Sequence, residues 1–121
     1  MLEEIIGQNL RRIKEIRFHK IKTITKNGYI KYIEHPCYVF LENDDCYIYV
    51  TLTHSDKVED FLVIKLRKNP NPKDERDSYY VADVRIDSKA EFARMLKGWK
   101  LDPLDDEDIR KLLDDLTEKD N

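Results

Sequence analysis

His35 and His54 are the two side chains of this sequence whose type and spacing best suit proton transfer. They flank the strands of a predicted antiparallel hairpin that turns at residues 43–44. A register with Leu41 opposite Cys46 brings both histidines to one face as diagonal neighbours, with Cβ atoms about 7 Å apart. Histidine's unperturbed pKa of about 6.5 allows one neutral and one charged ring near neutrality, so the pair predicts a general base and a general acid. The alternative is that both rings rim the core.

Lys65 and Arg67 lie on the next predicted strand and could donate to a phosphate or stabilise developing negative charge. Their alternation with leucines is also typical of a solvated sheet face. His19 has no predicted place near the other two histidines. No cysteine or histidine spacing matches a familiar zinc motif, so the sequence predicts neither a metal nor another cofactor.

A charge asymmetry separates the two ends of the chain, although the net charge is only −3. The stretch 11–31 holds eight basic residues against one acidic residue, a balance of +7. Such a stretch favours a polyanion partner, here RNA, and is also compatible with a solvated charged face. The candidate nucleic-acid-binding residues are Arg11, Arg12, Arg17, Lys20 and Lys22. Tyrosines on the following hairpins could stack on bases unless a helix covers them.

The last twenty residues, 102–121, hold nine acidic residues against three basic residues, a balance of −6. Asp102 and Pro103 are expected to start a helix with an apolar stripe, so part of this acidity favours the helix dipole. The remaining charge could bind a basic protein partner through Asp105, Asp106 and Asp108.

The hydrophobic pattern predicts an α+β fold, an antiparallel hairpin-built sheet with an N-terminal helix and two C-terminal helices. The N-terminal helix is expected at 2–14, and the C-terminal helices at 88–99 and after residue 102. Strands are expected around an Asn27-Gly28 turn, at 37–41 and 46–52, and at 61–67 and 79–87, with a loop at 69–78. One domain over 1–121 is expected, with a body at 1–101 and an acidic helix at 102–121.

The predicted register gives the central hairpin one aliphatic and one aromatic face. The aliphatic face comprises Cys37, Val39, Leu41, Cys46, Ile48, Val50 and Leu52, and the aromatic face comprises Tyr38, Phe40, Tyr47 and Tyr49. Cys37 lies about 13 Å along the strand from the position facing Cys46, which is too far for a disulfide. Both cysteines are therefore expected as free thiols.

No apolar run approaches the roughly 18 residues that cross a bilayer, and the first residues lack the features of a signal peptide. These observations predict no membrane partner and a cytoplasmic location.

The order of a helix, a sheet with His35-Pro36 and Thr53-His54, and then Lys65 and Arg67 resembles the layout of small barnase, EndoU, colicin and RelE-like nucleases of phages, toxin systems and mobile elements. The resemblance covers about residues 2–86. The acidic C-terminal helix lies outside that common core, and no glutamate stands beside the histidines as a barnase-like base would. The resemblance implies a metal-independent RNA-cleaving or RNA-binding domain.

In that function the two histidines would exchange protons with the 2′-hydroxyl and the leaving oxygen, while Lys65 and Arg67 stabilise the phosphorane-like charge. The competing expectation is an interaction protein, such as an immunity protein, an antitoxin or an inhibitor, that uses its acidic helix.

Overall fold

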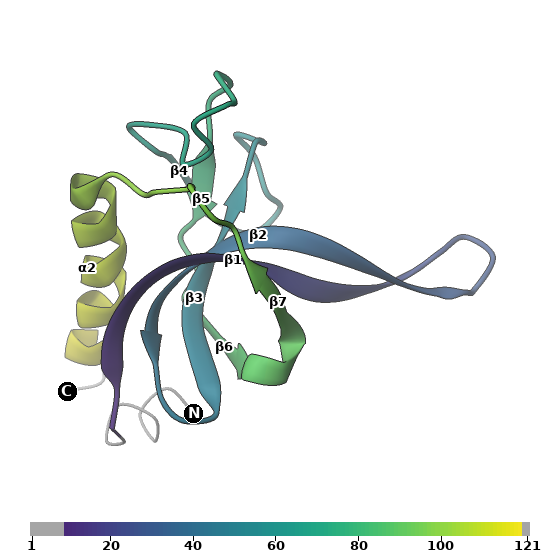
Figure 1. The fold of residues 1–121 in the computed structure, drawn as a ribbon, viewed down its shortest axis with the longest axis horizontal. Helices are drawn as coiled ribbons and strands as arrows, with labels where there is room; N and C mark the ends of the chain where they lie inside the picture. The colour runs from purple at the N-terminus through teal and green to yellow at the C-terminus, as the bar shows by residue number, and fades with distance from the viewer. Residues whose placement is uncertain (1–8, 120–121) are drawn as a thin grey trace.

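Long-range strand pairing dominates the fold, which Figure 1 shows as one antiparallel sheet with a helix on its side. The computed structural model describes the backbone of residues 9–119 and the side chains of residues 9–115. The strands are β1 (Arg11–Ile24), β2 (Ile30–Glu42), β3 (Cys46–Thr53), β4 (Val63–Lys65), β5 (Tyr79–Val81), β6 (Arg85–Ser88) and β7 (Phe92–Met95). A 3-10 turn, η1 (Lys89–Glu91), precedes β7, and the helix is α2 (Pro103–Lys119). The sheet order is β4-β5-β3-β2-β1-β7, and β6 also pairs with β3.

The prediction of an N-terminal helix is wrong for those of its residues that the structure describes. Residues 11–14 belong to β1, whose pairing with β2 runs from Arg11 opposite Glu42 to Ile24 opposite Ile30. Residues 9 and 10 are in neither a helix nor a strand, and residues 2–8 of that expected helix lie outside the described residues. Pairing with a distant strand therefore prevails here over local helical spacing.

The expected helix at 88–99 is also wrong. The Ser88 hydroxyl does accept a hydrogen bond from the Ala90 amide as a cap should, but the turn that it caps is only the three residues of η1. The chain then becomes β7, because Phe92 is buried and Leu96 donates its amide to the Ile16 carbonyl at 2.8 Å. Within residues 9–119 the α+β fold thus has one α-helix, at the C-terminal end, and β1 and β7 occupy described parts of the other two expected helices.

The hairpin at Asn27-Gly28 is confirmed. Gly28 has a φ of +83°, which favours glycine, and its amide donates to the Thr25 carbonyl at 2.9 Å. Both strands are much longer than the sequence predicts, and beyond the body of the sheet they form a projecting two-stranded ribbon (Figure 1).

The predicted register of β2 and β3 is wrong. Leu41 pairs with Ile48 and Val39 with Tyr49, and an irregularity separates these two pairs. Because the register moves by one residue over part of the hairpin, the two faces mix aromatic and aliphatic side chains. One face contributes Tyr38, Phe40, Ile48, Val50 and Leu52 to the main core, and the other buries Cys37, Val39, Tyr47 and Tyr49 with Phe92. The four aromatic residues of the expected platform are therefore buried.

The helix α2 packs on the main core, as the sequence predicts. Ile109 is fully buried, and Leu112 and Leu113 pack against the same cluster. Both cysteines are free, as expected. Within residues 9–119, no helix combines the length and apolar character that a membrane crossing requires.

Candidate functional site

A pocket of about 270 Å³ contains both of the histidines that the sequence pairs. Its walls come from β2, the end of β3, the loop after β4 and the segment before α2. The lining residues are His35, Pro36, Leu52, Thr53, His54, Asn69, Ser78 and Trp99. A few polar groups around an apolar floor are the usual composition of a small-molecule site.

The register does not place His35 on the predicted face. Its cross-strand neighbour is His19 on β1, whose ring contacts Tyr49 and Phe92, so the His35 side chain belongs to the face opposite that of Leu52. The pairing of β2 with β3 ends at Cys37 opposite Thr51. Both pocket histidines thus lie just beyond the end of the β2–β3 ladder. The ring of His35 is half-buried, and no hydrogen bond or ion pair holds it within the described part of the chain.

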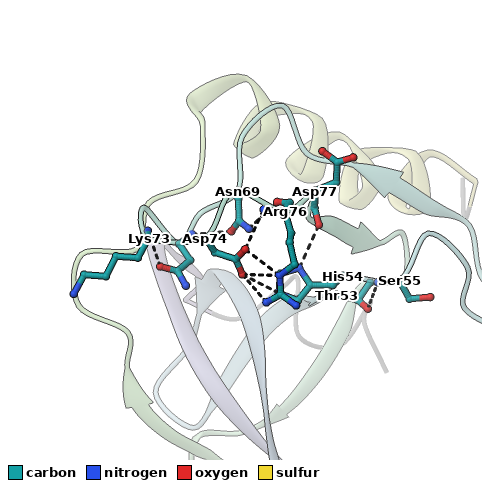
Figure 2. A network of polar contacts seen from close by, with 9 residues as sticks. Thr53, His54, Ser55, Asn69, Lys73, Asp74, Arg76 and Asp77 are labelled. Atoms are coloured by element: carbon teal, nitrogen blue, oxygen red, sulfur yellow. Dashed lines mark hydrogen bonds and ion pairs between the residues drawn. The ribbon is translucent and has the colours of Figure 1, made fainter.

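His54 is held by the loop that follows β4, as Figure 2 shows. Its Nδ1 lies 3.2 Å from the Asp77 carbonyl oxygen, which can only accept, so Nδ1 carries the hydrogen in this contact. Its Nε2 lies 3.5 Å from the Asp74 carboxylate and 3.4 Å from Nη2 of Arg76. The loop therefore fixes the orientation of the imidazole ring.

The Asp74 carboxylate remains ionised beside His54. Hydrogen bonds from the Arg76 side chain, the shortest at 2.7 Å, hold the pKa of Asp74 well below its usual range, helped by the Arg76 backbone amide. The side chain of Asn69 stabilises the same loop. Its Nδ2 donates to the Arg76 carbonyl at 2.9 Å, and its Oδ1 accepts from the Asn71 backbone amide at 2.9 Å. A carboxylate and a guanidinium thus lie beside His54, although neither belongs to the pocket lining.

Lys65 and Arg67 do not line this pocket. Nζ of Lys65 lies 3.4 Å from the Asp77 carboxylate. The Arg67 guanidinium binds Asp105 at 2.7 Å and Asp108 at 2.8 Å. Both side chains therefore join the loop or the helix to the sheet, away from the two histidines.

The five basic residues of the predicted nucleic-acid surface are divided by the fold. Arg11 binds Glu42 and Asp44, and Arg17 binds Glu15. Arg12 lines a second pocket, of about 630 Å³, between β1 and α2. Lys20 and Lys22 lie exposed on the projecting ribbon. They share this region with Lys26 and Lys31, which make no hydrogen bond or ion pair among residues 9–115.

The acidic residues expected to bind a partner face the sheet. Asp106 is buried and accepts a 2.6 Å hydrogen bond from the Tyr38 hydroxyl and a 3.0 Å bond from Arg110. Asp105 is 1% exposed, and with Asp108 it binds Arg67. These carboxylates are thus largely occupied in attaching α2 to the sheet.

Sequence reasoning misses three kinds of residue in the pocket or beside it. The helical spacing places Trp99 in a helix that is not formed, and Asn69 and Ser78 fall in a stretch with no predicted structure beyond a loop. Asp74 and Arg76 belong to a charged stretch that carries no functional signal of its own. The Asn69-Pro70-Asn71-Pro72 sequence is the one local signal of an ordered loop, because asparagine side chains bind backbone groups two residues ahead.

Within the described residues, no group of three or more His, Cys, Asp or Glu side chains is arranged to hold a metal ion. Comparison with protein-family models, curated proteins and solved structures gave no match. Function must therefore be inferred from the geometry of the pocket and of the surface around it.

Proposed function

We propose that this protein is a metal-independent RNA-cleaving domain in which His35 and His54 transfer protons. The observation that carries the proposal is that both residues belong to the lining of one pocket of about 270 Å³. Two imidazoles that reach a common space would suit RNA cleavage, because that reaction removes a proton from the 2′-hydroxyl and delivers one to the leaving oxygen.

The environments of the two rings assign their roles. His35 makes no hydrogen bond or ion pair in the described part of the chain, so its ring is available to accept the 2′-hydroxyl proton. His54 is assigned the donor role because the loop orients its ring, with Nε2 lying 3.5 Å from the Asp74 carboxylate. His35 is thus the general base and His54 the general acid.

The reaction follows from these roles. The 2′-oxygen forms a bond to the adjacent phosphorus as His35 takes its proton. The bond from phosphorus to the 5′-oxygen breaks as His54 donates a proton to that oxygen. The products are a 2′,3′-cyclic phosphate and a free 5′-hydroxyl.

Charge on the phosphate would be stabilised by groups beside the histidines. Thr53, Asn69 and Ser78 bring hydrogen-bond donors to the pocket lining, and Arg76 adds a cation next to His54. In this proposal Arg76, which is paired with Asp74 beside His54, takes the role that the sequence predicts for Lys65 and Arg67, because those two side chains lie away from the histidines.

The test is cleavage of an end-labelled single-stranded RNA in the presence of EDTA. Each of His35→Ala and His54→Ala should lower the rate by roughly 100-fold or more, the usual contribution of a general acid or base. Lys57→Ala, an exposed change three residues from His54, should leave it unaltered. A rate that persists in the double histidine variant, or no cleavage by the folded unmodified protein, would refute the proposal.

A further inference from the structure

The part of the β1–β2 hairpin from Lys20 to Glu34, called the arm below, is unusually exposed for a structure rich in apolar residues. Figure 1 shows it leaving the body of the sheet on the side opposite α2. Five of the nine large apolar side chains that are exposed in the described residues belong to the arm: Ile24, Tyr29, Ile30, Tyr32 and Ile33. This concentration is not explained by packing within the chain, and it is typical of a binding surface.

The register determines which of these side chains share a face. Ile24 lies opposite Ile30, Lys22 opposite Tyr32, and Lys20 opposite Glu34. Because successive residues of a strand point to opposite faces, these six side chains lie on one face of the arm. All six are exposed, with Tyr32 at 66% and Ile24 at 74%. That face therefore joins apolar and aromatic surface at the tip to cations nearer the base.

The charge of the arm indicates what kind of partner it can bind. Its cations are Lys20, Lys22, Lys26 and Lys31, and its only acidic residue is Glu34. None of the four lysines makes a hydrogen bond or ion pair within the described chain, whereas Arg11, Arg17 and Arg67 are all paired. Unpaired cations interleaved with exposed aromatic and aliphatic side chains suit a partner that carries both regularly spaced anions and flat apolar faces.

We infer that the arm is the RNA-binding element of this protein and holds a single strand on this face, with phosphates on Lys20 and Lys22 and a base on Tyr32. A single strand is favoured because its unstacked bases can lie on tyrosine rings, which bases inside a duplex cannot reach. Tyr32 stands directly opposite Lys22, so one strand can meet a ring and a cation at the same level of the arm.

The arm also leads to the histidine pocket. Pro36 comes two residues after Glu34 on β2, so it shares the face of Tyr32 and Glu34, and it is part of the pocket lining. A strand bound along the arm would thus pass the pocket, so this inference rests on the proposed RNA-cleaving function and identifies how its substrate is held.

The test uses a fluorescein-labelled 2′-O-methyl RNA oligonucleotide, which lacks the attacking hydroxyl, so that binding is measured without cleavage. Fluorescence anisotropy should show that Tyr32→Ala weakens binding by roughly 5- to 150-fold, the range expected when one base no longer stacks on a ring. Lys20→Gln with Lys22→Gln should reduce the slope of log affinity against log salt by about 1.4, at about 0.7 for each phosphate that a lysine no longer neutralises. Leu62→Ala and Lys57→Gln with Lys97→Gln are matched controls, since these side chains are exposed but lie outside the arm.

Unchanged binding by both arm variants would overturn the inference, and continued RNA cleavage by the unmodified protein would then leave the proposed function standing. Arm-dependent binding without any cleavage would support the inference and refute the catalytic proposal. If the arm variants instead change the mass of the protein in sedimentation equilibrium while RNA binding is unaltered, the arm is a protein contact and the inference is wrong.

Discussion

Arg67 and Asp105 bind each other through two groups of the arginine. The Arg67 guanidinium donates to the Asp105 carboxylate at 2.7 Å, and the Arg67 backbone amide donates to the same carboxylate at 3.0 Å. The sequence suggests separate functional roles for these residues, one in catalysis and one in partner binding. Their contact instead attaches the first turn of α2 to the segment after β4.

Asp105→Ala should therefore destabilise the fold. Asp105 is 1% exposed, and the change removes the hydrogen bonds that its carboxylate accepts from Arg67, a type of bond that contributes about 1.5–3 kcal/mol when one partner is charged. Urea unfolding would measure the loss. Glu107→Ala is the matched control, because Glu107 is an exposed acidic residue on the same helix and should change stability by no more than about 0.5 kcal/mol. Equal effects of the two changes would show that the Arg67 contact contributes nothing specific.

The apolar attachment of α2 can be tested at one residue. Ile109 is 0% exposed, so Ile109→Ala should lower the free energy of unfolding by about 2–5 kcal/mol through reduced burial and a cavity. Leu104→Ala removes an equally large side chain that is 53% exposed on the same helix, and it should have little effect. A small loss for Ile109→Ala would mean that α2 is detachable from the sheet.

The sequence predicts the local turns of this fold better than its long-range contacts. Asn27-Gly28 signals a hairpin because glycine readily takes the positive φ that the turn requires, and this signal depends on nothing distant. The strand at 92–95 could not be predicted in the same way. Its helical spacing is real, but the burial of Phe92 against Tyr47 and Tyr49 outweighs that local preference, and the sequence does not show which rings will meet.

The register of the central hairpin also could not be predicted from the sequence, and it affects the position of the candidate site residues. A period-two pattern does not reveal the irregularity between Val39 and Leu41, yet this irregularity sets which residues face each other. His35 and His54 still share a pocket, because both lie beyond the end of the ladder. Trp99 joins them from a segment more than forty residues away along the chain, which no local pattern could indicate.

Stability should fall in acid partly through Asp106. Burial by itself would raise the pKa of this carboxyl, but hydrogen bonds from Arg110 and Tyr38 outweigh burial and lower the pKa below its usual value of about 3.9. A carboxyl with a lowered pKa in the folded state stabilises the fold above its unfolded pKa, and this contribution is lost as pH falls through the folded value. The loss is therefore expected below about pH 4.

Asp106→Asn tests this assignment, because asparagine cannot ionise. The difference in unfolding free energy between the unmodified protein and Asp106→Asn should be largest near pH 7 and should shrink as pH falls below about 4. Urea titrations at pH 7, 5 and 3 would measure it, with Glu107→Gln as the control on the same helix. A difference that stays constant across this range would show that the charge of Asp106 does not contribute.

The two cysteines should differ sharply in reactivity. Cys37 is 1% exposed, its thiol donates to the Arg17 carbonyl at 3.4 Å, and burial raises the pKa of that thiol to about 12. Cys46 is only partly buried. Because the thiolate is the reactive form, a thiol reagent at pH 8 should modify Cys46 quickly and Cys37 only after unfolding. Cys46→Ser should remove the fast phase, and the reaction in urea should reveal both thiols. Rapid modification of two thiols in the native protein would contradict the burial of Cys37 between β1 and the aromatic side chains around Phe92.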